Sequence, residues 1–317
     1  MSETAFSQGI GEWVGDAEVY GADGRYAGIG RDTRSVRADD RAGRVTVEVS
    51  FDGPFSLSGT YTIAEQGPHR TYEGPLNVGF AETLSEGLVA AHNYWPDLGL
   101  SQRFFLMMLP DGTRQLSLAL LSRGERLRWT VVGENRRRPA PAPNAGEQPR
   151  PDGRDRPAPD PAALRNDPAA GRGELLLLRS GTWSGRLHCL DAGLQQCGTV
   201  ECSETVTARE GDTDAGDAAA RRFDVELAGL GCAADASFTM ASDGWSVWTP
   251  TGDIVGSAAL SGGRALSGQF HCRDDGLRMW RREAAALDGT AKAVLHTWYR
   301  GEQRVGTVYG TLAFEPA

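Results

Sequence analysis

Histidine and tyrosine side chains are the groups of this chain best suited to exchange protons with a ligand near neutral pH. His92 and Tyr94 lie two residues apart in an apolar run at 90–95. Since successive side chains of a β-strand point to opposite faces, these two would share one face. If that face lines a cavity, the pair could trade protons with a bound ligand. The alternative is a histidine at a strand end that is hydrogen-bonded to a loop.

His271 is a second candidate. It alternates with Gln269 and Arg273 along one face of an expected strand, while Phe270 and Cys272 occupy the other face. Apolar side chains of a half-buried strand face the core, so we expect His271 to point outward. The alternative is an inward polar cluster, which would place His271 in a ligand-binding site.

The elements that must position these residues occur twice. Asp-Gly-Thr at 111–113 and Arg-Gly-Glu at 123–125 return 177 residues later (288 − 111), at 288–290 and 300–302. In each copy two apolar runs flank the Arg-Gly-Glu turn, which is typical of a β-hairpin. A Gly-x-Trp-x-Gly motif stands at the head of each half, around Trp13 and around Trp183. The chain is therefore a tandem duplication.

The hairpins supply further candidates for a ligand site. Leu116, Leu118 and Leu120 alternate with more polar residues, and we expect these leucines to form the inner, ligand-binding face of the first unit. The 177-residue displacement places Tyr299 on the inner side of the second hairpin. Trp298 then falls on the outer face, where it predicts a contact between the two units.

Composition excludes several classes of function. The 317 residues carry a net charge of −9, which offers no electrostatic footprint for nucleic acid. Lys292 is the only lysine among 33 basic residues. No apolar run reaches the roughly 18 residues that a membrane-spanning helix needs. The acidic start lacks the features of a secretory signal, so we expect a cytoplasmic protein.

Metal and cofactor chemistry have little support. All five cysteines fall in the second half, and their odd number favours free thiols. A metal site built from His188, Cys189, Cys197 and Cys202 is the alternative, but no Cys-x-x-Cys spacing supports it. The sequence also has no nucleophile-elbow, Walker, zinc-protease or Rossmann motif. We expect no metal and no cofactor.

Strand-like alternation at 45–51 and closely spaced turn signals predict an all-β chain. With Gly-x-Trp at the first strand of each half, the chain resembles the lipocalin/calycin superfamily. The resemblance is to bacterial phycobiliprotein-lyase-like proteins and to two-barrel proteins such as carotenoid hydratase-like proteins and decalin-forming Diels–Alderases. It implies that Trp13 and Trp183 close the barrel bases. We predict two tandem antiparallel lipocalin-like β-barrels, at 1–135 and 174–317, joined by a Pro-rich linker at 136–173.

Such barrels predict binding of an apolar or aromatic small molecule. We expect a cofactor-free isomerisation, cyclisation or hydration in specialised metabolism, which rests on shape, exclusion of water and proton relay. The alternative is a non-catalytic carrier or chaperone of a pigment, haem or lipid. A third hypothesis is a scaffold whose barrels are filled by side chains. The oligomeric state stays open.

Two sets of residues carry this functional prediction. The candidate catalytic residues are His92, Tyr94 and Tyr299. The candidate ligand-binding residues are Leu116, Leu118, Leu120, Trp248, His271 and Trp298. Trp248 enters because it precedes a turn at Pro250 and could line a barrel mouth, although aromatic residues of this kind more commonly pack in a core.

Overall fold

The computed structural model describes residues 8–39, 43–66, 69–85, 87–138, 175–208, 221–228, 236–250 and 252–317. The predicted Pro-rich linker at 136–173 lies outside the described residues, except for its first three positions. No helix in the described ranges has the length and hydrophobicity that crossing a membrane requires.

Alternating apolar residues build the first barrel. Val45, Val47, Val49 and Phe51 are buried, while the polar residues between them are more exposed. Each strand pairs antiparallel with its neighbour in sequence, and β10 returns to pair with β1, which closes the ring. Its strands are β1 (Gly11–Gly21), β2 (Tyr26–Ala38), β3 (Arg44–Asp52), β4 (Ser56–Gln66), β5 (His69–Glu73), β6 (Val78–Ser85), β7 (Leu88–Trp95), β8 (Leu100–Met108), β9 (Arg114–Arg123) and β10 (Arg126–Arg137).

The second barrel repeats this order after a short 3-10 turn, η2 (Leu176–Leu178). Its last strand pairs with its first and closes a second ring. Its strands are β11 (Gly181–Asp191), β12 (Gln196–Ala208), β13 (Arg221–Ala228), β14 (Ala236–Ser242), β15 (Ser246–Trp248), β16 (Ile254–Ser261), β17 (Ala265–Cys272), β18 (Leu277–Ala285), β19 (Ala291–Arg300) and β20 (Gln303–Pro316).

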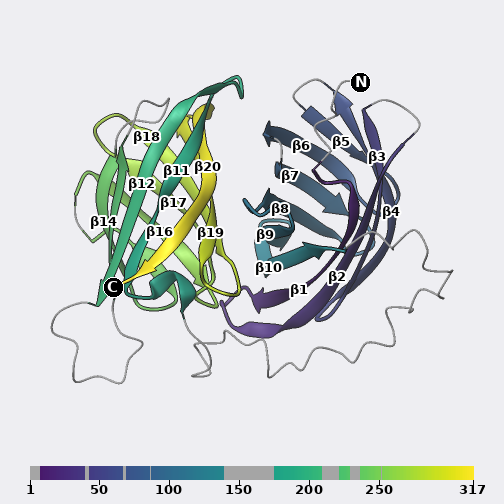
Figure 1. Cartoon of the computed structure of the whole chain (residues 1–317), viewed down its shortest axis with the longest axis horizontal. Helices are drawn as coiled ribbons and strands as arrows, with labels where there is room; N and C mark the ends of the chain where they lie inside the picture. Colours follow the sequence, from purple (N-terminus) through teal and green to yellow (C-terminus); the bar gives the residue numbers. More distant parts are fainter. Residues whose placement is uncertain are drawn as a thin grey trace.

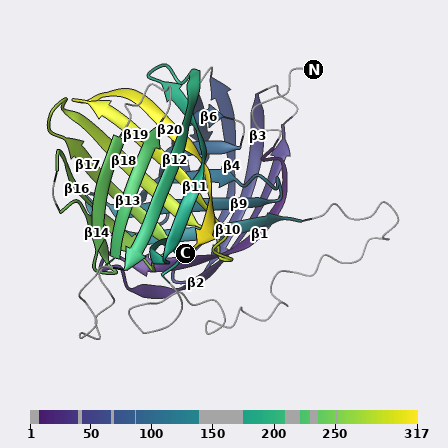
Figure 2. The same cartoon turned by 60° about the vertical axis from the view of Figure 1, so that its left-hand side comes forward.

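The predicted fold class is confirmed: the chain is all-β, with two tandem antiparallel barrels side by side (Figure 1). The duplicated hairpins are β9–β10 and β19–β20, each turning at its Arg-Gly-Glu tripeptide. Trp13 and Trp183 are 2% and 0% exposed. Figure 2 shows the barrels after rotation, with the strands of the second running diagonally around it, as ring closure requires.

One apolar cluster belongs to both barrels. In Figure 1 the second barrel presents β19 and β20 to the side of the first that β6 to β10 form. Buried side chains of both barrels pack together there. They include Tyr20, Leu88, Phe105, Met107, Leu116, Leu118 and Val132 from the first barrel, and Leu190, Ala265, Ala284, Ala293, Leu295 and Tyr309 from the second. A shared core of this kind holds the barrels as one packed unit.

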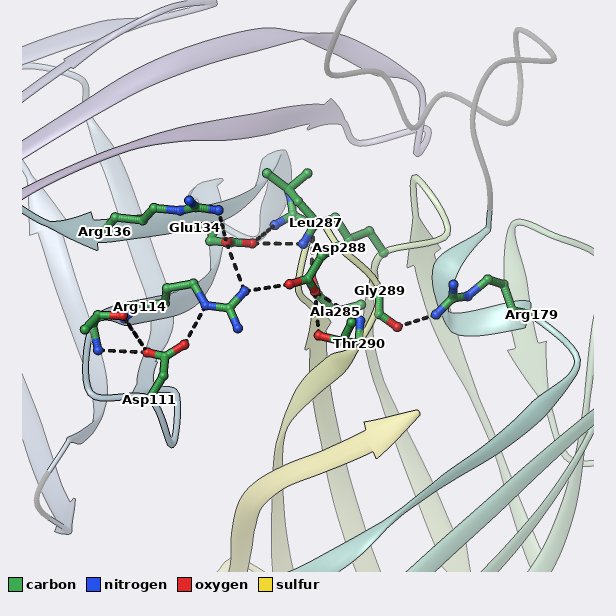
Figure 3. Close-up of polar contacts among 12 residues, drawn as sticks. Asp111, Arg114, Glu134, Arg136, Arg179, Ala285, Leu287, Asp288, Gly289 and Thr290 are labelled. Atoms are coloured by element: carbon green, nitrogen blue, oxygen red, sulfur yellow. Dashed lines mark hydrogen bonds and ion pairs between the residues drawn. The ribbon is translucent and has the colours of Figure 1, made fainter. Parts of the chain in front are cut away.

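Charged groups reinforce this interface. Arg264 of the second barrel is fully buried, and its Nη1 lies 3.0 Å from Glu18 Oε2 of the first. Figure 3 shows Arg114 pointing between two copies of the duplicated turn, with its Nε 2.6 Å from Asp111 and its Nη1 2.8 Å from Asp288. Beside it, the backbone N–H of Leu287 donates to a Glu134 carboxylate oxygen.

The interface reverses the expected inner and outer faces of the hairpins. Leu116 and Leu118 lie in the cluster between the barrels, with Leu120 packed against it, and do not line the first barrel's interior. Trp298, expected to make the contact between units, packs in the core of the second barrel. The physical reason is that each barrel covers an outer face of the other, so an outer strand face there is as apolar as an inner one.

Candidate functional site

A cavity lies between the two barrels. It has a volume of about 580 Å³ and is lined by side chains of β6 to β8 and of β17 to β20. Sheet alternation aims these side chains out of their own barrel and toward the other, so neither barrel forms the cavity alone. Its principal lining residues are Phe80, Glu82, His92, Arg103, Gln269, Arg278, Trp280, Arg282, Thr297, Tyr299, Glu302, Arg304 and Thr307.

Trp280 lies close to two guanidinium groups. Arg282 lies 4.0 Å from the centre of its ring, and Arg103, from the opposite barrel, lies 5.6 Å away. Both distances fall within the range of a cation–π interaction. Arg282 also stands 6.0 Å from the ring of Phe105. The cavity thus combines a flat aromatic surface with fixed positive charge.

The duplication relates these contacts. A displacement of 177 residues maps Arg103 onto Trp280 (280 − 103) and Phe105 onto Arg282 (282 − 105). Strand pairing agrees, since Arg103 pairs with Leu120 in the first barrel and Trp280 with Thr297 in the second, again 177 residues on (297 − 120). Residues at equivalent positions of the two halves therefore meet across the interface.

His92 lines this cavity as a neutral imidazole. Its Nε2 lies 2.8 Å from Arg103 Nε and must accept the hydrogen bond, because a guanidinium can only donate. Burial lowers the pKa of His92, and the positive charges of Arg103 and Arg282 lower it further. The ring packs edge-on against Phe80, with centroids 5.8 Å apart. A neutral imidazole whose Nδ1 carries the proton can donate a hydrogen bond from Nδ1 to a ligand.

Of the three predicted catalytic residues, the structure brings two to the cavity. His92 enters from β7 and Tyr299 from β19, where Arg278 stacks 5.2 Å from the Tyr299 ring. Tyr94 shares the outer face of β7 with His92, as alternation predicts, but it is 44% exposed and does not line the cavity. The catalytic roles of His92, Tyr94 and Tyr299 stay predictions.

The predicted ligand-binding residues lie elsewhere. Leu116, Leu118 and Leu120 belong to the inter-barrel apolar cluster, and Trp298 to the core of the second barrel. His271 is exposed on the outer face of β17, as its alternation with Phe270 indicates. Trp248 is half-buried in β15 and does not line the inter-barrel cavity.

The interior of the first barrel holds a smaller cavity, of about 100 Å³. Its wall is aromatic, with Phe51 and Phe55 stacked 4.7 Å apart and Tyr61 set edge-on to Trp95. Burial raises the pKa of Tyr61 to about 12. The space is too small for the drug-sized ligands that cavities of roughly 300 Å³ or more accept.

The interior of the second barrel contains a charged network. Lys292 Nζ lies 2.8 Å from carboxylate oxygens of both Glu204 and Glu283, and Arg281 contacts the same two carboxylates. His296 Nε2 completes the network 3.1 Å from Glu283. All five side chains are at most 3% exposed. This arrangement is closed and fully paired in charge, which fits a structural role.

Sequence reasoning missed Arg103, Trp280 and Arg282 as site residues. No local pattern singles them out, because the cavity that they line is formed by both halves together. Among the described residues, no group of three metal-ligating side chains lies close enough to hold a metal ion.

Comparisons with known proteins show which other chains have a similar fold. The chain matches no family model and no curated protein sequence. A solved structure of a protein of unknown function from the DUF3598 family of Nostoc punctiforme is similar over 98% of both chains, with a TM-score of 0.55 and 10% identity. The S-type phycobiliprotein lyase of Guillardia theta matches 43% of this chain and 92% of its own, with a TM-score of 0.34 and 8% identity. The first of these two similarities shows that a DUF3598 protein has a similar fold over 98% of both chains.

Proposed function

We propose that this chain binds an apolar or aromatic small molecule in the cavity between its two barrels. The observation that carries the proposal is the 580 Å³ volume lined jointly by both barrels. That volume lies within the roughly 300–1,000 Å³ typical of small-molecule sites. Phe80 is 55% exposed at this cavity, and Trp280 and Tyr299 add aromatic surface. Exposed aromatic surface in a concave site is typical of ligand contact.

Filling each cavity in turn tests where the ligand binds. Ala90 lines the inter-barrel cavity and Ala119 lines the interior of the first barrel. The probe is N-phenyl-1-naphthylamine, a neutral aromatic compound whose fluorescence rises in apolar surroundings. We expect Ala90→Phe to abolish probe binding and Ala119→Phe to leave it unchanged. The reverse result would place the ligand inside the first barrel.

Native mass spectrometry on protein purified from its own host separates a carrier from an enzyme. A carrier would retain an apolar compound that denaturation releases and that can then be identified. Release of no compound from the folded, purified protein would count against the carrier.

A second candidate function is catalysis of a cofactor-free isomerisation, cyclisation or hydration. The observation that favours it is that His92 and Tyr299 line one cavity, where the Nδ1–H of the neutral imidazole can donate a hydrogen bond to a reacting oxygen. Once a released ligand has identified the substrate class, turnover by His92→Asn and Tyr299→Phe tests it. Unchanged turnover in both variants would remove these residues from the mechanism.

A further inference from the structure

The inter-barrel cavity is positively charged in an acidic protein. Arg103, Arg278, Arg282 and Arg304 line it against only two carboxylates, whereas the whole chain carries −9. One of those carboxylates, Glu82, is already bonded to Arg304. A cleft lined by one sign of charge concentrates ligands of the opposite sign.

Arg282 is the group that most requires a ligand. Arg282 is only 7% exposed, and its side chain lines the cavity. In the described part of the chain, no carboxylate lies within ion-pair distance of its guanidinium, and its buried Nε has no hydrogen-bond partner. Burial lowers the pKa of Arg282 to about 10. A buried charge without a counter-ion is unfavourable, and an oxyanion would supply the missing acceptor.

Two further donors face the same cavity. The exposed Arg103 reaches it from the first barrel, where its Nε donates to the neutral His92 and its guanidinium lies 5.6 Å from the Trp280 ring. Thr307 is 1% exposed, and its hydroxyl has no hydrogen-bond partner in the described ranges. Trp280 lies within cation–π distance of both guanidinium groups and adds aromatic surface to the cavity, against which the rings of a ligand can pack.

We propose that the ligand of this cavity is an aromatic oxyanion, whose carboxylate, sulfonate or phosphate group binds Arg282 and Arg103 while its ring system lies against Trp280. This inference rests on the proposed function and names its ligand class. Arg282 of the second barrel sets the position of the anion, and Arg103 closes on it from the first.

A matched pair of fluorescent probes tests the charge requirement. The sulfonate 8-anilinonaphthalene-1-sulfonate has the rings of N-phenyl-1-naphthylamine plus one negative charge. We expect Arg282→Met to weaken binding of the sulfonate by at least about tenfold, because a charge-assisted hydrogen bond is lost. Binding of the neutral probe should change less than about twofold. Arg103→Met, at an exposed side chain that folding does not depend on, should show the same selectivity.

The control variant is Arg273→Met, which removes an exposed arginine outside the cavity and should alter neither affinity. If Arg282→Met bound each probe as tightly as the unsubstituted protein does, the oxyanion proposal would be overturned while the proposed function would stand. Failure of both probes to bind would overturn the proposed function itself. Competition then defines the ligand class: 2-naphthoate should displace the sulfonate, and displacement by inorganic phosphate at the same concentration would refute the aromatic requirement.

Discussion

Replacement of Lys292 by methionine tests the charged network inside the second barrel. Its ammonium is 0% exposed and lies 2.8 Å from carboxylate oxygens of both Glu204 and Glu283. At an effective dielectric constant of about 20, one such contact corresponds to roughly 6 kcal/mol before desolvation is subtracted. Methionine keeps the length of the side chain but leaves two carboxylates facing the single charge of Arg281. The network then changes from neutral to one net negative charge.

We expect Lys292→Met to lower the free energy of unfolding by about 3–5 kcal/mol, the usual cost of removing one partner from a buried ion pair. Urea denaturation followed by tryptophan fluorescence measures it, since Trp183 lies 5.3 Å from the ammonium. The double variant Lys292→Met with Glu204→Gln restores neutrality and should recover at least about 1 kcal/mol of that loss. A higher free energy of unfolding in the double variant than in Lys292→Met would show that charge imbalance, and not poor packing, causes the loss.

The matched control is an ion pair of similar length at the surface. Arg186 Nε lies 2.7 Å from Glu201 Oε1, with side chains 69% and 63% exposed. Water screens this pair, so Arg186→Met should cost less than about 1 kcal/mol. If Lys292→Met lowered the free energy of unfolding no more than this control, burial would not strengthen the contacts of the ammonium with Glu204 and Glu283.

Three further outcomes follow from buried contacts. The cations around Glu283 hold its pKa well below the usual value of about 4.5, against the opposing effect of burial. Its contribution to stability is therefore present above about pH 4.5 and is lost as the pH falls through the folded-state pKa. Urea denaturation at about pH 3–7 should show that the free energy of unfolding falls less steeply with acid in Glu283→Gln. Arg264→Met removes the buried cation that joins the barrels, and calorimetry should resolve two unfolding transitions, whereas a single unshifted one would contradict the coupling. Gly262 has φ +57°, and a Cβ there would lie 2.0 Å from Tyr20 Oη, whereas Gly124 has φ +59° and open space around it. Gly262→Ala should therefore lower the free energy of unfolding by about 1–3 kcal/mol more than Gly124→Ala. Equal losses in the two variants would show that backbone strain alone is responsible.

The strands and the duplication were predictable because their signals are local. Period-two alternation at 45–51, the Arg-Gly-Glu turns and the repeated Gly-x-Trp each depend on a few neighbouring residues. Antiparallel pairing of neighbours follows from short turns, and a ring removes the exposed edges. The all-β class and the two-barrel architecture therefore came from sequence alone.

The inner and outer faces of the hairpins at the interface were not predictable, because polarity does not identify the barrel interior there. Leu118 faces outward and is buried because the other barrel covers it. Lys292 and His296 face inward and are buried because carboxylates from neighbouring strands pair with them. Arg282 faces the cavity between the barrels, which exists only when both halves are assembled. Each of these placements depends on residues far away in the sequence.

Equivalent residues that face each other mark the place of a two-fold axis in a symmetric pair of barrels. A homodimer of one ancestral barrel would put two identical side chains there, so that an arginine would have to face an arginine. Fusion of two copies into one chain lifts that restriction. Arg103 can then face Trp280, and Phe105 can face Arg282. On this view the duplication turned a self-matching contact into two asymmetric pairs, in each of which one half supplies an aromatic ring and the other a cation.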